Sequence, residues 1–163
     1  MRPRDYARRL LAESPPATLP IQPAAYIEKL GFTIRAEEMA DRALLSWGQR
    51  LVLISAGLRE ASARWYLAHE LAHLILPEHE SQSSDDAEAR KLRFEREANE
   101  FAAELLMPWP LLEREYEAIR GVPGESWVGK LATIFGVTPE VMRIRLSASS
   151  KPEFKRAVQL WRG

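Results

Sequence analysis

Cysteine is absent from this chain of 163 residues. Disulfide bonds and thiolate metal sites are therefore excluded. A net charge is absent as well, because lysine plus arginine and aspartate plus glutamate each number 23. No overall charge thus marks a nucleic-acid or membrane-surface binder. Long apolar runs are also missing, since none approaches the roughly 20 residues of a membrane-spanning helix. The length fits one domain, or one domain with a small appendage.

The first residues of the chain give no secretory signal. Arginines near Met1 are followed by a short helical pattern, whereas a signal sequence would continue into an apolar segment. We therefore expect a cytoplasmic protein without membrane contact. Charge is uneven along the later chain: acidic residues outnumber basic ones over residues 78–117, and basic residues predominate over residues 118–163.

The spacing of apolar residues predicts an α+β fold with a small sheet of about three strands among helices. Strands are expected at residues 32–34, 43–47 and 51–55, with a tight turn joining the last two. Helices are expected at residues 4–12, 23–30, 59–76, 85–106, 110–119, 126–135, 139–146 and 152–161. We predict a main domain over residues 1–120 and a helical segment over residues 121–163.

One expected helix carries polar residues in an otherwise apolar stretch. Residues 65–76 read WYLAHELAHLIL, which is apolar almost all the way round and predicts a buried helix. His69, Glu70 and His73 are costly to bury there without partners. The two histidines project from one face of a helix, and H-E-x-x-H is the zinc-protease arrangement. Two core histidines satisfied by hydrogen bonds are the alternative interpretation.

A catalytic zinc normally has three protein ligands, so a third ligand is needed. On the helix expected at residues 85–106, a rotation of about 100 degrees per residue places Glu95 on the apolar face. Asn99 shares this face and is expected to hydrogen-bond a ligating histidine ring and so hold its orientation. The other glutamates of the helix fall on the opposite side and are expected to face solvent, namely Glu97, Glu100 and Glu104. Glu95 is therefore the favoured third ligand.

His79 is the main alternative third ligand, and Glu97 or no third ligand at all are the remaining alternatives. With His69 and His73 it matches the spacing H-E-x-x-H-x-x-G-x-x-H of another class of zinc protease. That pattern requires a glycine where this chain has Leu76, because the backbone turns sharply at that position. Leucine followed by Pro77 is a poor substitute.

Two blocks of sequence resemble a known family. Residues 64–74, RWYLAHELAHL, are similar to the R-F-T-L-A-H-E-L-G-H block of the ImmA/IrrE metallopeptidases. Residues 95–108, EREANEFAAELLMP, are similar to that family's E-x-x-A-N-x-F-A-A-x-L-L-M-P block. The blocks occur in the family's order and at its distance, and with the flanking elements the resemblance covers roughly residues 20–147.

The resemblance implies a gluzincin-like (zincin-like) peptidase domain. The spacing within residues 131–146 predicts a helix-turn-helix-like C-terminal part after it. The resemblance implies one zinc ion held by His69, His73 and Glu95, with Glu70 as catalytic base. It also implies the substrate class: helix-turn-helix (Xre-type) repressors of mobile elements, prophages, toxin–antitoxin systems or stress regulons. The chain departs from the family block in having Tyr66 in place of threonine. Tyr66 and Arg64 are the candidates for substrate contact or the wall of the site.

Two further hypotheses concern the mode of action. The strand at residues 51–55 is expected to offer a sheet edge to an extended substrate. Residues 131–146 have helix-turn-helix spacing, with only Arg143 and Arg145 as long polar side chains for reading bases. Weak DNA contact through residues 126–163 is therefore an alternative. A non-proteolytic zinc protein that docks on a repressor or on DNA through these helices is the alternative function.

Overall fold

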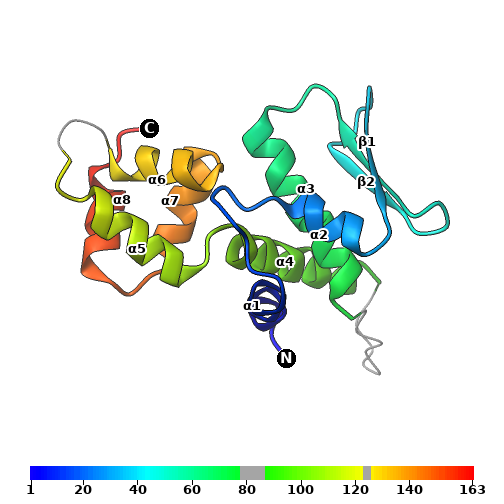
Figure 1. Ribbon diagram of the computed structural model, residues 1–163, viewed down its shortest axis with the longest axis horizontal. Coiled ribbons are helices and arrows are strands. Elements are labelled where there is room, and N and C mark those ends of the chain that lie inside the picture. The colour runs from blue at the N-terminus through cyan, green and yellow to red at the C-terminus, as the bar shows by residue number, and fades with distance from the viewer. Residues whose placement is uncertain (78–86, 123–125) are drawn as a thin grey trace.

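The computed structural model describes residues 1–77, 87–122 and 126–163. The described helices are α1 (Pro3–Glu13), α2 (Pro23–Lys29), α3 (Glu60–Ile75), α4 (Ala87–Leu106), α5 (Trp109–Ile119), α6 (Trp127–Phe135), α7 (Pro139–Ser147) and α8 (Pro152–Leu160), and the strands are β1 (Thr33–Glu37), β2 (Ala43–Ser46) and β3 (Leu51–Ser55) (Figure 1). The expected α+β class is confirmed. None of the described helices has the length and hydrophobicity that crossing a bilayer requires.

The sheet has the strand order β1-β3-β2. β2 and β3 form an antiparallel hairpin, closed by a turn in which the Arg50 N–H donates to the Trp47 carbonyl oxygen at 3.1 Å. β1 runs parallel to β3, with Thr33 opposite Leu51. Both sides of β3 are therefore hydrogen-bonded, and the prediction that β3 offers a free edge is wrong. β3, the last strand in sequence, lies between the two earlier strands. β2 is therefore an edge strand, hydrogen-bonded to another strand on one side only.

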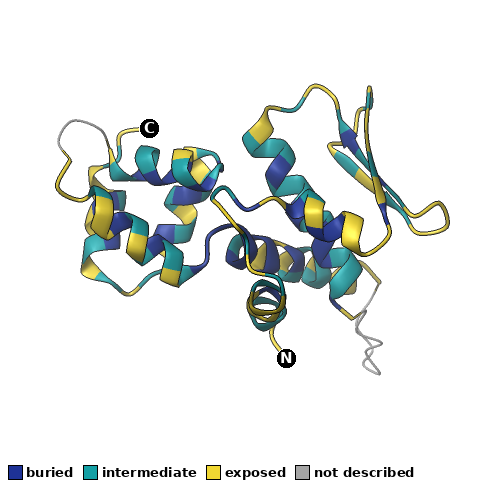
Figure 2. Ribbon diagram, in the orientation of Figure 1, coloured by how far each residue is buried: buried dark blue, intermediate teal, exposed yellow. Residues whose placement is uncertain are grey.

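α3 and α4 pack against each other and form the centre of the molecule (Figure 1). Small side chains on both helices, including Ala68 and Ala72 of α3 and Ala98 and Ala102 of α4, are completely buried in one core cluster. Small residues at a helix contact allow the two backbones to approach closely. In Figure 2 both helices carry buried residues, coloured dark blue, among residues of intermediate exposure. This close packing brings the two predicted motif blocks together.

The last four helices gather at the opposite end from the sheet (Figure 1). The Tyr116 ring of α5 lies edge-on to Trp127 of α6 at 5.5 Å and to Phe154 of α8 at 5.3 Å. Gly136 ends α6 in the left-handed conformation, and the Thr138 hydroxyl accepts from the Val141 N–H to start α7. α5 thus packs with the later helices, and the two-part division after residue 120 stays a prediction.

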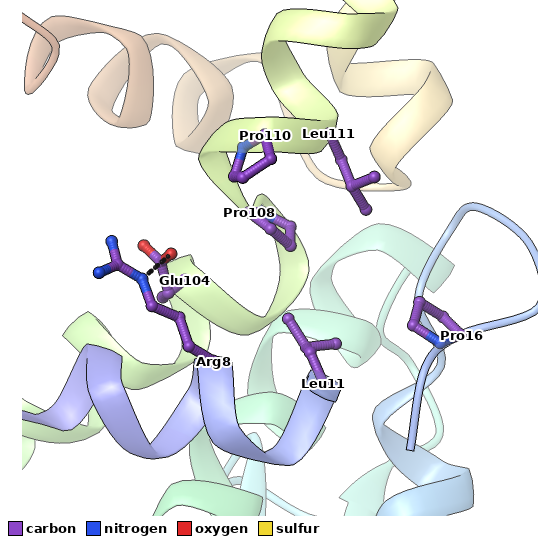
Figure 3. A pocket seen from close by; sticks show the side chains of 7 residues that line it. All are labelled: Arg8, Leu11, Pro16, Glu104, Pro108, Pro110 and Leu111. Carbon is purple, nitrogen blue, oxygen red and sulfur yellow. Dashed lines mark hydrogen bonds and ion pairs between the residues drawn. The ribbon is translucent and has the colours of Figure 1, made fainter. Parts of the chain in front are cut away.

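Glu104 is buried, with 1% of its surface exposed, although the sequence predicted a solvent-facing side chain. Its carboxylate accepts from Arg8 of α1 at 2.8 Å (Figure 3). It also accepts from Arg145 of α7 at 2.5 Å. The prediction was wrong because α1 packs on a second face of α4 and Arg145 of α7 reaches the same carboxylate, which the spacing of apolar residues on α4 alone does not reveal. Arg145 also donates to the Met107 carbonyl oxygen. Its predicted role as a base-reading side chain is therefore wrong as well.

Candidate metal centre

α3 presents two imidazoles on one face. Its end is well defined, because Pro77 follows the buried Leu76 and has no N–H to continue the helix. His69 and His73 lie one turn apart, with ring centroids 4.8 Å from each other. Phe94 of α4 packs against the His73 ring at 4.8 Å and limits its movement.

Potential ligand atoms of three side chains converge between α3 and α4. The His69 Nε2 lies 3.0 Å from Glu95 Oε2 and 3.1 Å from His73 Nε2, and the His73 Nε2 lies 3.5 Å from Glu95 Oε1. Ligands about 2.05 Å from a tetrahedral zinc stand about 3.3 Å apart. The observed separations bracket that value. His69, His73 and Glu95 can therefore hold a metal ion, and their N₂O donor set fits zinc.

Asn99 orients the first histidine. Its Oδ1 lies 2.9 Å from His69 Nδ1. A carbonyl oxygen only accepts, so Nδ1 carries the proton in this hydrogen bond, and the lone pair of Nε2 points at the convergent atoms. Burial lowers the pKa of His73, with a further lowering by His69 and an opposing effect of Glu95. A lowered pKa favours neutral imidazole, which is the form that binds metal.

Glu70 follows His69 on α3, but its carboxylate is not among the three candidate ligands. Burial raises its pKa above the ordinary value, which His69 opposes and the Glu95 carboxylate reinforces. Glu70 and Tyr66 line an open cleft of about 480 Å³ together with His69, Glu95 and Asn99. The cleft floor comes from α3 and α4, and its rim from Asp41, Arg42 and Ala43 at the start of β2. Glu95 keeps 43% of its side chain exposed, so solvent reaches the site.

Comparison with known proteins then decides the family. Residues 27–147 match the model of the peptidase M78 family, described as the IrrE N-terminal-like domain. The chain belongs to this family. The predicted resemblance to the ImmA/IrrE proteins is confirmed, and the described fold is consistent with their zincin-like architecture.

A solved structure with a similar fold is a Mycobacterium tuberculosis transcriptional regulator, with a TM-score of 0.70 and 22% sequence identity. The match covers 93% of the present chain and 48% of that one, so this IrrE-like chain spans about half the length of the regulator. At this identity the likeness concerns the fold alone. No curated protein matches the sequence.

Of the two residues predicted to contact substrate or form the wall of the site, only one lies at the cleft of this IrrE-like fold. Tyr66 lines the cleft, whereas Arg64 points away and donates to the Gly136 carbonyl oxygen at 2.6 Å. On a helix, position 64 is rotated by about 140 degrees from position 69, but position 66 by only about 60 degrees. His79 lies outside the described residues.

The rim residues Asp41 and Arg42 were missed by sequence reasoning. They stand far from both motif blocks in the chain, and no motif includes them. Their place at the cleft depends on β2 being the edge strand next to α3, which only the strand order reveals.

Proposed function

We propose that this protein is a zinc metalloendopeptidase with one zinc ion held by His69, His73 and Glu95. The observation that supports this most directly is the placement of Glu70 beside three convergent ligand atoms in an open cleft. Catalytic zinc sites characteristically combine three protein ligands with an accessible position for water or substrate. Membership of a peptidase family supports the same reaction class.

The proposed mechanism gives each residue a separate task. Bound zinc would act as a Lewis acid, which lowers the pKa of a water molecule and polarises the scissile carbonyl. Glu70 accepts the proton of the attacking water and returns it to the leaving amine. Asn99 keeps the His69 ring in a single orientation.

An extended substrate would bind along β2 rather than β3. β2 is hydrogen-bonded to β3 on one side only, and Ala43 at its start lines the cleft. Backbone groups of an edge strand are free to pair with a peptide, and the cleft then selects side chains. A peptide on this edge would pass over Glu70 and the metal ligands.

The proposed substrate is a helix-turn-helix, Xre-type repressor of a mobile element, prophage, toxin–antitoxin system or stress regulon. The family resemblance supports this class, and the structural similarity to a transcriptional regulator is in keeping with a role in gene regulation. The test is co-expression with repressors encoded beside the protein, followed by intact-mass analysis. Wild-type protein is expected to yield two repressor fragments, and Glu70→Gln to retain zinc and leave the repressor whole. An active Glu70→Gln protein would contradict the mechanism.

A non-proteolytic regulator that docks on a repressor or on DNA is the second candidate. Exposed basic residues on and after α8, such as Lys155, Arg156 and Arg162, favour contact with phosphate. α7 is less suited to contact DNA bases, because Arg145 is hydrogen-bonded to Glu104 and Arg143 is paired with Glu140. Repressor inhibition that is equal for wild type and Glu70→Gln would favour docking over cleavage.

A further inference from the structure

Among the described residues, one basic side chain at the rim of the cleft has no ion-pair partner. Arg42 is the one arginine or lysine among the described residues that line the cleft. Its guanidinium lies over the Tyr66 ring, 5.5 Å from the centroid. No carboxylate in the described part of the chain forms an ion pair with it. Arg35 of β1, by contrast, is paired with Glu37 at 2.7 Å.

The backbone of Arg42 is fixed even though its side chain is exposed. Its carbonyl oxygen accepts from the Ser55 N–H of β3 at 2.9 Å, which continues the hairpin ladder by one bond beyond β2. Tyr66 lies on α3 one turn before Glu70. Arg42 therefore directly precedes the edge strand β2, lines the same cleft as the proposed catalytic base Glu70, and has its guanidinium against the Tyr66 ring.

We infer that Arg42 binds a carboxylate of the substrate and makes the peptidase selective for an acidic residue near the scissile bond. This inference rests on the proposed function. A peptide paired with an edge strand places its side chains about 5 Å from those of the strand, where opposite charges attract and like charges repel. A guanidinium held over an aromatic ring is pre-organised for two parallel hydrogen bonds to a carboxylate.

Two sources of carboxylate fit this chemistry: an aspartate or glutamate side chain, and the free C-terminus of a peptide. The side chain is favoured because the cleft is open and β2 extends beyond Arg42, so a chain can continue through the site. Peptide libraries with amidated and with free C-termini separate the two sources.

The test measures peptide binding to the zinc-loaded Glu70→Gln protein, which retains bound peptides uncut. Randomised, amidated peptides are captured and sequenced. Enrichment of aspartate and glutamate at one position is expected, with a loss of about tenfold or more in Arg42→Ala, as for one charge-assisted pair. Arg42→Glu is expected to reverse the preference to lysine and arginine. Tyr66→Phe keeps the ring and is expected to keep the preference, whereas Tyr66→Leu weakens it.

Arg50→Ala is the matched control, because Arg50 also lies over an aromatic ring, Phe32 at 5.9 Å, but outside the cleft. It is expected to leave the preference unchanged. Melting temperature and zinc content verify that each variant is folded. Absence of acidic enrichment, absence of any peptide binding, or equal enrichment in Arg42→Ala would overturn the inference. Enrichment confined to free C-termini would assign Arg42 to the terminal carboxylate and overturn the side-chain assignment.

The same peptides separate this inference from the proposed function. Enriched peptides are incubated with the wild-type protein and analysed by mass spectrometry. Cleavage beside the acidic residue supports both the peptidase function and the carboxylate site at Arg42. Binding that depends on Arg42 without cleavage would contradict the peptidase and leave the carboxylate site standing.

Discussion

The Arg64 guanidinium donates a hydrogen bond to the Gly136 carbonyl oxygen across 2.6 Å and so joins α3 to the turn between α6 and α7. Arg64 is only 5% exposed, and its other terminal nitrogen donates to Glu60 at 2.7 Å. Glu104 of α4 likewise accepts a hydrogen bond from Arg145 of α7, which joins α4 to the C-terminal helices. Both helices that carry the candidate metal ligands are therefore tied to the C-terminal helices by buried polar groups.

Gly136→Ala is expected to destabilise the protein by about 2 kcal/mol or more, because a left-handed residue other than glycine costs about 1–3 kcal/mol. Gly136 has φ +62°, and a Cβ there would collide with the Arg64 guanidinium and with Pro20 Cβ at 2.7 Å. Gly129→Ala in α6 is the control, since a Cβ at Gly129 meets no neighbour and its φ is ordinary. It is expected to leave stability unchanged or raise it by up to about 1 kcal/mol. Urea denaturation measures both, and equal effects would contradict this account.

Glu104→Gln is expected to cost about 3–5 kcal/mol of folding stability, as for a buried ion pair that loses one partner. The Arg145 side chain is 10% exposed and would keep its charge without a carboxylate to neutralise it. Glu100→Gln on the same helix is the matched control: Glu100 is 46% exposed, lies 3.9 Å from Arg4, and should change stability by less than about 0.5 kcal/mol. Chemical denaturation at neutral pH compares the two variants. Similar midpoints would show that the buried pair has no structural role.

Asn99→Ala is expected to weaken zinc binding by about 10- to 100-fold, the usual effect of removing the hydrogen-bond partner of a ligating histidine. The reason is that His69 Nδ1 loses its acceptor at 2.9 Å and the ring is free to turn. Asn99→Asp retains an acceptor oxygen and is expected to bind zinc as tightly as the wild type. Competition with a chromophoric chelator measures the affinities. Unchanged affinity in Asn99→Ala would remove Asn99 from the site.

The elements nearest to the metal site were predictable from sequence because the signals are local. The spacing of His69 and His73 on one helix, and of Glu95 on the apolar face of another, depends only on helical geometry. The hairpin was likewise predictable, since a tight turn connects two β-rich segments. The structure places these predicted groups together.

The residues that sequence reasoning misplaced depend on contacts between distant elements. Glu104 is buried because α1 packs on α4 and Arg145 of α7 reaches its carboxylate. Arg64 is buried because the α6–α7 turn lies on α3. Arg42 reaches the cleft because β2, and not β3, forms the sheet edge beside α3. Periodicity within one segment identifies its most apolar face, but it does not reveal which elements cover the other faces.

The central claim, a zinc ion held by His69, His73 and Glu95, is tested most directly by metal analysis of the purified protein. Inductively coupled plasma mass spectrometry is expected to find one zinc per chain in the wild type and in His79→Ala. Glu95→Ala is expected to lose the zinc while its circular dichroism spectrum stays that of a folded α+β protein. Stoichiometric zinc in Glu95→Ala together with loss of zinc in His79→Ala would contradict this site.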